Sequence, residues 1–146
     1  MNATHQLFSQ LFANLYALQL KTQSYHWHVK GPHFKQLHEF FEEQYGALSE
    51  MIDSVAERMV TLGFVVPATL SQIQELKTCK DGQPNHSGQE MVSDLGKDYV
   101  VLVELLYKVI DKVKDNKDEG SITFLTDILV KIEKMSWMIH ACSGGF

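Results

Sequence analysis

Apolar residues recur at helical spacing in four segments of the chain, and stretches containing glycine and polar residues separate these segments. The first segment, residues 4–30, carries one apolar stripe: Leu7, Leu11, Leu15 and Leu18. The second follows Pro32 and ends near Gly63, a residue type that commonly terminates helices. The third opens at the capping box Ser87-Gly-Gln-Glu90 and continues through Met91, Leu95, Leu102, Leu105, Leu106, Val109 and Val113. The fourth covers residues 118–141, so the pattern predicts four long helices.

The links between the predicted helices indicate how the helices pack. The first and third links are only a few residues long, so each should join an antiparallel helical hairpin. The second link, residues 63–86, is about two dozen residues long, more than neighbouring antiparallel helices require. A crossover to the other end of the bundle explains this length, and the capping box Thr69-Leu-Ser-Gln72 predicts a short helix over residues 70–77. The expected fold is all-α: a ferritin-like four-helix bundle with one long crossover containing a short helix, formed by residues 1–146 as a single domain.

Composition narrows the class of protein further. Hydrophobic residues make up 45% of the chain with only three prolines, which suits a helical globular protein, and the net charge of −5 argues against binding of polyanions. The N-terminal MNATHQLFSQLF lacks the basic segment of a signal peptide, and no apolar run reaches the roughly 18 residues of a membrane span. We therefore expect a cytoplasmic protein without a membrane segment, in which Cys79 and Cys142 are free thiols.

The second predicted helix carries the candidate chemistry. Its metal-ligand residue types lie in one stripe, at about 0°, 40°, 60° and 100° around the helix axis: His38, Glu42, Asp53 and Glu57. Small residues line the rest of this stripe: Gly46, Ser49 and Ala56. The apolar residues form a neighbouring face: Phe34, Leu37, Phe41, Leu48, Ile52, Val55 and Met59. A solvated face would normally carry lysine and arginine, so the stripe is a candidate metal-binding surface.

One metal ion cannot be held by both ends of this stripe within a single chain. His38 and Asp53 are about 22 Å apart along a helix, whereas ligand bonds are about 2 Å long. The third and fourth predicted helices carry no Glu-x-x-His motif that would complete a di-iron site within the bundle. A second copy of the helix, antiparallel across a two-fold axis near residues 47–48, would bring the His38 end of one chain against the Asp53 end of the other. Gly46 and Ala47 would permit this close approach.

His26 completes the candidate site. It precedes Gly31 by five residues and His38 follows Gly31 by seven, so a hairpin turning at Gly31-Pro32 places both imidazoles at a similar height. Two imidazoles with two or three carboxylates suit iron(II), as a mono-iron or di-iron site, although zinc could also occupy it. Any one such residue is usually a packing or surface residue. The hypothesis depends on five residues that fit one geometry.

Motifs between Leu18 and Gly63 occur in a characteristic order: His26-Trp27, KGPHF, LHEFFEE and ID-x3-E-R, with a weaker Trp137-Met138 near the end of the last helix. They resemble the signature of the Dps mini-ferritins, and the resemblance covers nearly the whole chain. It implies a ferroxidase whose ligands are His26, His38 and Glu42 of one subunit with Asp53 and Glu57 of its two-fold partner. It also implies a hollow homo-dodecamer that oxidises Fe(II), with hydrogen peroxide as the preferred oxidant, and stores ferric mineral as protection against oxidative damage.

The chain departs from the family pattern at several positions. Glu42 stands where the family more often has aspartate, which puts one metal distance in doubt. His28 replaces a common asparagine, and we expect a turn or surface role for it and for His33. Trp27 would lie beside the site, where family members are thought to absorb stray oxidising equivalents, or would simply pack the hairpin.

Of two further features of the family, the acidic pore lining has candidate residues in this chain, and the basic DNA-binding termini do not. Four acidic residues lie near the start of the last helix and along it, where the family places acidic pore linings: Asp118, Glu119, Asp127 and Glu133. DNA-binding members use Lys- or Arg-rich termini, but no basic residue precedes Lys21 here and the C-terminus reads Cys-Ser-Gly-Gly-Phe. With a net charge of −5 per chain, direct DNA binding is not expected.

Two alternatives to a ferroxidase remain. One is a non-enzymatic shell that compacts DNA or acts as an adhesin, with structural metal sites. The other is a bundle whose histidines bind zinc for structure only. Anaerobic iron titration followed by peroxide distinguishes a ferroxidase from both.

Overall fold

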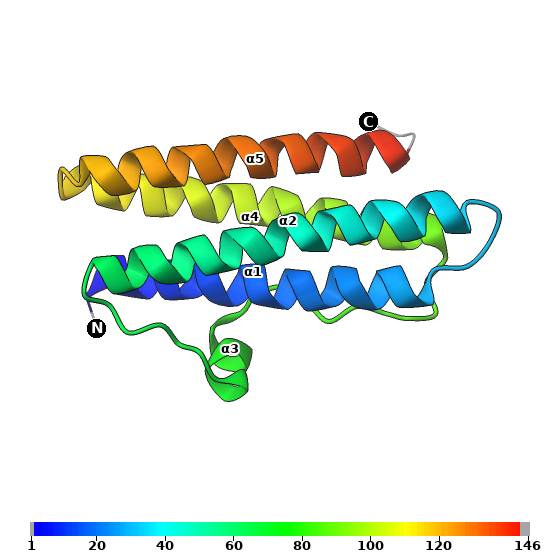
Figure 1. The fold of residues 1–146 in the computed structure, drawn as a ribbon, viewed down its shortest axis with the longest axis horizontal. Helices are drawn as coiled ribbons and strands as arrows, with labels where there is room; N and C mark the ends of the chain where they lie inside the picture. Colours follow the sequence, from blue (N-terminus) through cyan, green and yellow to red (C-terminus); the bar gives the residue numbers. More distant parts are fainter. Residues whose placement is uncertain (1, 144–146) are drawn as a thin grey trace.

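A computed structural model of the chain describes residues 2–143 and contains five helices and no strand in that range. The helices are α1 (Ala3–His28), α2 (Phe34–Thr61), α3 (Leu70–Leu76), α4 (Gly88–Asp115) and α5 (Glu119–Ser143). The four long helices form a bundle in which α1 pairs with α2 and α4 pairs with α5, each pair antiparallel (Figure 1). None of these helices is long and apolar enough to cross a membrane.

The crossover between α2 and α4 runs the length of the bundle, as its length predicts. In Figure 1, α2 ends at the end of the bundle opposite to the one at which α4 begins. The connecting segment packs along α1, and α3 contacts α1 from outside the bundle. The ferritin-like arrangement with a short helix in the crossover is therefore confirmed.

Local signals in the sequence fix the start of α4 and the end of α2. At the start of α4, Ser87 and Glu90 form both halves of the predicted capping box. At the end of α2, Gly63 adopts a φ of +80°, and the amides of Gly63 and Phe64 donate to carbonyl oxygens of the last turn, at 2.9 and 2.8 Å. This is a Schellman ending, in which glycine accepts the left-handed conformation without strain.

Two helix ends in the α1–α2 hairpin and one helix cap differ from the sequence prediction. α1 ends at His28 rather than Lys30, because Val29 becomes extended (ψ 141°) and buries its side chain in the core. Pro32 lies in the turn before α2, since helical structure begins only at Phe34. The predicted capping box of α3 forms by half: Thr69 Oγ1 accepts from the Gln72 amide, but the Gln72 side chain accepts from the Thr69 hydroxyl rather than from the Thr69 backbone amide.

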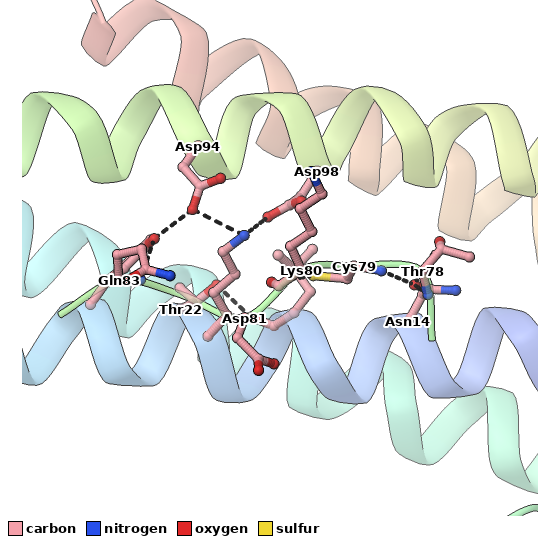
Figure 2. Close-up of polar contacts among 12 residues, drawn as sticks. Asn14, Thr22, Thr78, Cys79, Lys80, Asp81, Gln83, Asp94 and Asp98 are labelled. Atoms are coloured by element: carbon pink, nitrogen blue, oxygen red, sulfur yellow. Dashed lines mark hydrogen bonds and ion pairs between the residues drawn. The ribbon is translucent and has the colours of Figure 1, made fainter. Parts of the chain in front are cut away.

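A buried cluster of ion pairs and hydrogen bonds links α1 to α4 and to the crossover. Lys21 is only 4% exposed, and its Nζ lies 3.0 Å from Asp94 Oδ2 and 2.7 Å from Asp98 Oδ2 (Figure 2). The hydroxyl of Tyr25 donates to Asp94 and accepts from the crossover amide of Gln83. The cluster thereby fixes the crossover against the hairpin that carries His26.

The crossover is fastened at a second point beside this cluster. Asn14 of α1 accepts hydrogen bonds from the amides of Thr78 and Cys79 at 2.9 and 3.0 Å (Figure 2). Burial raises the pKa of the Cys79 thiol to about 12, so it is protonated at neutral pH. Cys79 and Cys142 are free thiols, as expected.

The Lys21 cluster predicts a loss of stability at alkaline pH. Burial opposes the charge of Lys21, but the hydrogen bond and negative charge of Asp98 outweigh it and raise the Lys21 pKa from 10.5 to about 12. A raised lysine pKa contributes stability that is present below 10.5 and disappears as the pH rises through about 12. Urea unfolding across this range should show a loss on the order of 2 kcal/mol. The loss should be smaller in Lys21→Met, and an equal loss in that variant would contradict this role of Lys21.

Candidate metal centre

The two predicted histidines meet at one end of the α1–α2 hairpin. The rings of His26 and His38 stack with centres 3.8 Å apart and planes 13° apart. His26 is buried and His38 half-buried, so the pair lies at the edge of the core. The structure therefore brings together, from adjacent helices, the two imidazoles that the hairpin argument placed at one height.

A reciprocal pair of hydrogen bonds fixes both rings. His26 Nδ1 lies 2.6 Å from the carbonyl oxygen of His38, and His38 Nδ1 lies 2.7 Å from the carbonyl oxygen of His26. Because a carbonyl oxygen only accepts, each Nδ1 must carry the proton. Each Nε2 then keeps its lone pair, which is the state in which histidine binds a metal. The backbone of the hairpin thus selects the tautomer that a metal site requires.

Glu42 extends this group on α2. Its Oε1 lies 4.0 Å from His26 Nε2, while its side chain is 62% exposed and hence free to move toward an ion. His26, His38 and Glu42 therefore form one half of a candidate site. Within residues 2–143 of one chain, no three His, Cys, Asp or Glu side chains are arranged to hold a metal ion.

Asp53 and Glu57 lie further along α2, on the same exposed stripe. A hydrogen bond with Asp53, together with its negative charge, raises the pKa of Glu57. The two carboxylates are thus close enough to repel one another, a pairing that a bound cation would stabilise. Along the helix, Asp53 lies about 22 Å from His38 and Glu57 about 28 Å from it, so one chain does not join the two groups.

The middle of the stripe is open at Gly46. A Cβ atom added there would meet no atom within 4 Å in the same chain. Ala47 instead lines a groove of about 340 Å³ between α2 and α5, beside Met135 and Met138. Gly46 rather than Ala47 is therefore the small residue at the centre of the exposed stripe.

Two aromatic rings at the site were not identified as such from the sequence. Phe34, expected among the apolar face residues, is 44% exposed and stacks on His38 with ring centres 5.0 Å apart. Tyr45 lies edge-on to His26, with centres 5.3 Å apart. The spacing could have revealed Tyr45, because it follows His38 by seven residues, two turns along the same face.

The other residues of the turn lie away from the imidazole pair. His28 is exposed, and its Nδ1 lies 2.7 Å from the carbonyl oxygen of Ser24 on its own helix. His33 is exposed at the start of α2. Trp27 is 59% exposed, and no ring contact joins it to either imidazole among residues 2–143. These positions agree with the surface roles expected for His28 and His33.

The acidic residues proposed for a pore have different surroundings. Asp118 pairs with Arg58 at 3.3 Å and accepts from the amide of Ser121, so these contacts lower its pKa. Asp127 pairs with Lys131 at 3.0 Å, whereas Glu119 and Glu133 are exposed. Their assignment to a pore stays a prediction.

Comparison with known proteins agrees with this fold. Residues 6–144 match the family described as the ferritin-like domain. A DNA protection during starvation protein from Brevibacillus brevis is 37% identical over 135 residues, covering 92% of this chain and 91% of the relative. A Dps crystal structure from Bacillus brevis superposes with a TM-score of 0.90 at 36% identity, covering 97% of this chain and 98% of that one.

A second similar structure is the Vibrio cholerae O1 Dps protein, described as a member of a broad superfamily of ferritin-like diiron-carboxylate proteins. It superposes with a TM-score of 0.91 at 27% identity, covering 94% of this chain and 87% of that one. The match to the ferritin-like domain and the similarity to these relatives extend over more than nine-tenths of the sequence. The chain belongs to the Dps family of ferritin-like proteins.

Proposed function

We propose that the protein is a ferroxidase mini-ferritin that oxidises Fe(II) and stores Fe(III) as mineral in a hollow homo-dodecamer in the cytoplasm. The observation that carries this proposal is the reciprocal pair of bonds between His26 and His38, which in the neutral imidazoles leaves the lone pair on both Nε2 atoms. A merely structural histidine pair has no need for two free nitrogen lone pairs at one edge of the bundle. Family membership and the diiron-carboxylate description of a relative support iron as the substrate.

The proposed site forms between two subunits related by a two-fold axis. His26, His38 and Glu42 of one chain would face Asp53 and Glu57 of the other, and symmetry would generate two such sites per dimer. The open surface at Gly46 supports a close approach of the two α2 helices. Zinc could occupy the same ligands, so the redox chemistry has to be tested with iron.

The chain's own residues would bind and orient the ferrous ions. The imidazoles would supply neutral nitrogen ligands, while the carboxylates would offset the positive charge that increases on oxidation. With hydrogen peroxide as oxidant, two ferrous ions and two protons yield two ferric ions and two waters. The reaction consumes iron and peroxide together, so the proposal includes protection against oxidative damage, without direct binding to DNA.

Removal of one imidazole should abolish the activity selectively. We expect His38→Ala to slow peroxide-driven oxidation of anaerobically bound Fe(II) by at least about 100-fold, since even substitutions behind the ligands of metal sites cost about 10–100-fold. The matched control is His33→Ala, which removes an exposed imidazole five residues away. The measurement is ferric absorbance after addition of peroxide. Equal activity of the two variants would contradict the proposed site, and zinc binding without iron oxidation in the wild type would favour a structural metal site.

Assembly should be sensitive at Gly46. A leucine there meets nothing within its own chain and should stabilise the helix by about 0.5–1 kcal/mol. At the two-fold contact it would overpack, at a cost of about 1–3 kcal/mol for each of two copies. Sedimentation should therefore show smaller species for Gly46→Leu, and a weaker effect for Gly46→Ala. An unchanged large oligomer for Gly46→Leu would place the axis elsewhere.

A further inference from the structure

Three of the six methionines in the chain line one groove, which is separate from the histidine pair. The groove lies between α2 and α5 and has a volume of about 340 Å³. Met51 lines it from α2, and Met135 and Met138 line it from α5. Met135 and Met138 are three residues apart, so they are neighbours on one face of α5, with Cβ atoms about 5–6 Å apart. Three thioether side chains therefore border the same space from two helices.

The wall of this groove is apolar and largely shielded from water. Ala47 of α2 and Ile128 of α5 also line it. Met51 is 5% and Met135 7% exposed, whereas Met138 is half-buried. An ion bound among these side chains would therefore meet few waters and would depend on ligands from the protein.

Charged side chains lie at the rim of the groove, and their charges balance. Glu43 and Glu50 come from α2, Lys131 and Lys134 come from α5, and all four are exposed. Lys131 is already paired with Asp127 at 3.0 Å. A monovalent cation held by neutral ligands carries one positive charge, which one rim carboxylate can offset. An ion of higher charge would leave excess charge in an apolar groove, which is costly.

The chemistry of the thioether sulfur limits which ion these side chains bind. Soft thioether ligands select Cu(I), whereas imidazole and carboxylate ligands suit iron and zinc. Methionine has three rotatable bonds, so sulfur atoms can converge on an ion without movement of the helices. Gln44 also lines the groove, but its side-chain oxygen accepts a hydrogen bond from the buried Tyr99 hydroxyl. The remaining buried ligands are thus the three sulfur atoms.

We propose that Met51, Met135 and Met138 form a Cu(I)-binding site that is separate from the proposed iron site. The ligands are neutral and soft, which favours Cu(I) over Cu(II). Free Cu(I) gives one electron to hydrogen peroxide and yields Cu(II), hydroxide and a hydroxyl radical. Binding at this groove stabilises Cu(I) against that oxidation, so the site would protect against copper as the histidine centre would protect against iron.

Methyl NMR of the full assembled protein, labelled with ¹³C at the methionine methyl groups, identifies the ligands directly. Cu(I) is added anaerobically to protein whose histidine centre is already filled with zinc(II) and whose thiols are removed by Cys79→Ala and Cys142→Ala. These steps are needed because imidazoles and thiols also bind copper. Cu(I) is diamagnetic, so the methyl signals stay sharp. We expect the signals of Met51, Met135 and Met138 to shift together and to reach their end point at about one Cu(I) per chain.

The methionines of the core provide matched controls. Met59 and Met91 are fully buried outside the groove, so their signals should not shift. In competition with a colorimetric Cu(I) chelator, Met138→Leu should weaken binding by at least about 10-fold, since even loss of an outer-shell partner costs about 10–100-fold in metal affinity. Met59→Leu should leave the affinity unchanged, and leucine preserves packing in both variants.

The wild type should show the same methyl shifts at a higher copper loading, once its two thiols are occupied, which checks that the cysteine replacements do not create the site. An unshifted signal from any of the three groove methionines, equal affinity of Met138→Leu and Met59→Leu, or no copper uptake would overturn the proposal. Each of these results would leave the ferroxidase proposal intact, because the histidine centre contributes no ligand to this groove.

Discussion

Subunits that carry His38→Ala and subunits that carry Asp53→Ala should each be inactive alone, and should regain iron oxidation when they are mixed. In a mixed dimer, one composite site carries both lesions, and the other combines an intact histidine half with an intact carboxylate half. Random mixing in equal amounts makes half of the dimers mixed, each with one intact site of two. About one quarter of wild-type activity should return. The measurement is the rate of ferric absorbance after co-refolding.

A second pair of variants provides the matched control. His38→Ala and Glu42→Ala damage the same half of the site, so each composite site of their mixed dimer lacks one ligand. This mixture should show no recovery, although its subunits associate equally well. Recovery in both mixtures, or in neither when mass spectrometry shows mixed dimers, would contradict a site shared between two chains.

Replacement of Lys21 by methionine should destabilise the fold strongly. Lys21 Nζ is the cation between Asp94 and Asp98, whose side chains are 28% and 15% exposed. Without Lys21, two partly buried carboxylates lie beside each other with no cation between them. Breaking a buried ion pair on one side costs about 3–5 kcal/mol, which corresponds to a fall in Tm of roughly 10 °C for a chain of this size. Thermal unfolding followed by circular dichroism measures the shift.

An exposed ion pair of the same composition is the control for Lys21. Lys131 and Asp127 lie 3.0 Å apart with side chains 58% and 64% exposed, so Lys131→Met should cost less than about 1 kcal/mol. Adding Asp94→Asn and Asp98→Asn to Lys21→Met should restore much of the lost stability, because the unpaired charges are then absent. Similar Tm values for the two single variants would show that burial does not strengthen the Lys21 cluster.

The helical framework was predictable because local signals in the sequence agree with one another. Apolar periodicity located the four long helices, and the Ser87–Glu90 capping box and Gly63 set two of their ends. The length of the link from residue 63 to residue 86 indicated the crossover. Helical spacing also placed His38, Glu42, Asp53 and Glu57 on one stripe, which the structure leaves at the surface of the chain.

Features that depend on contacts between helices were not predictable in this way. The carbonyl partners of His26 and His38 depend on the relative height and rotation of α1 and α2, which periodicity gives only coarsely. Lys21 resembles an ordinary surface lysine until packing brings α4 and its two carboxylates within 3.0 Å. Phe34 was expected on the apolar face of the second helix, but it lies at the start of α2, 44% exposed and stacked on His38.

Anomalous diffraction from crystals soaked anaerobically with Fe(II) tests the shared site most directly. Data collected on both sides of the iron absorption edge locate the ions without reference to the protein. We predict iron peaks within bonding distance, about 2 Å, of His26 or His38 Nε2 of one subunit and of the Asp53 or Glu57 carboxylate of its two-fold partner. Iron bound by ligands from a single chain, or peaks only at other acidic residues such as Glu119 and Glu133, would contradict the shared site.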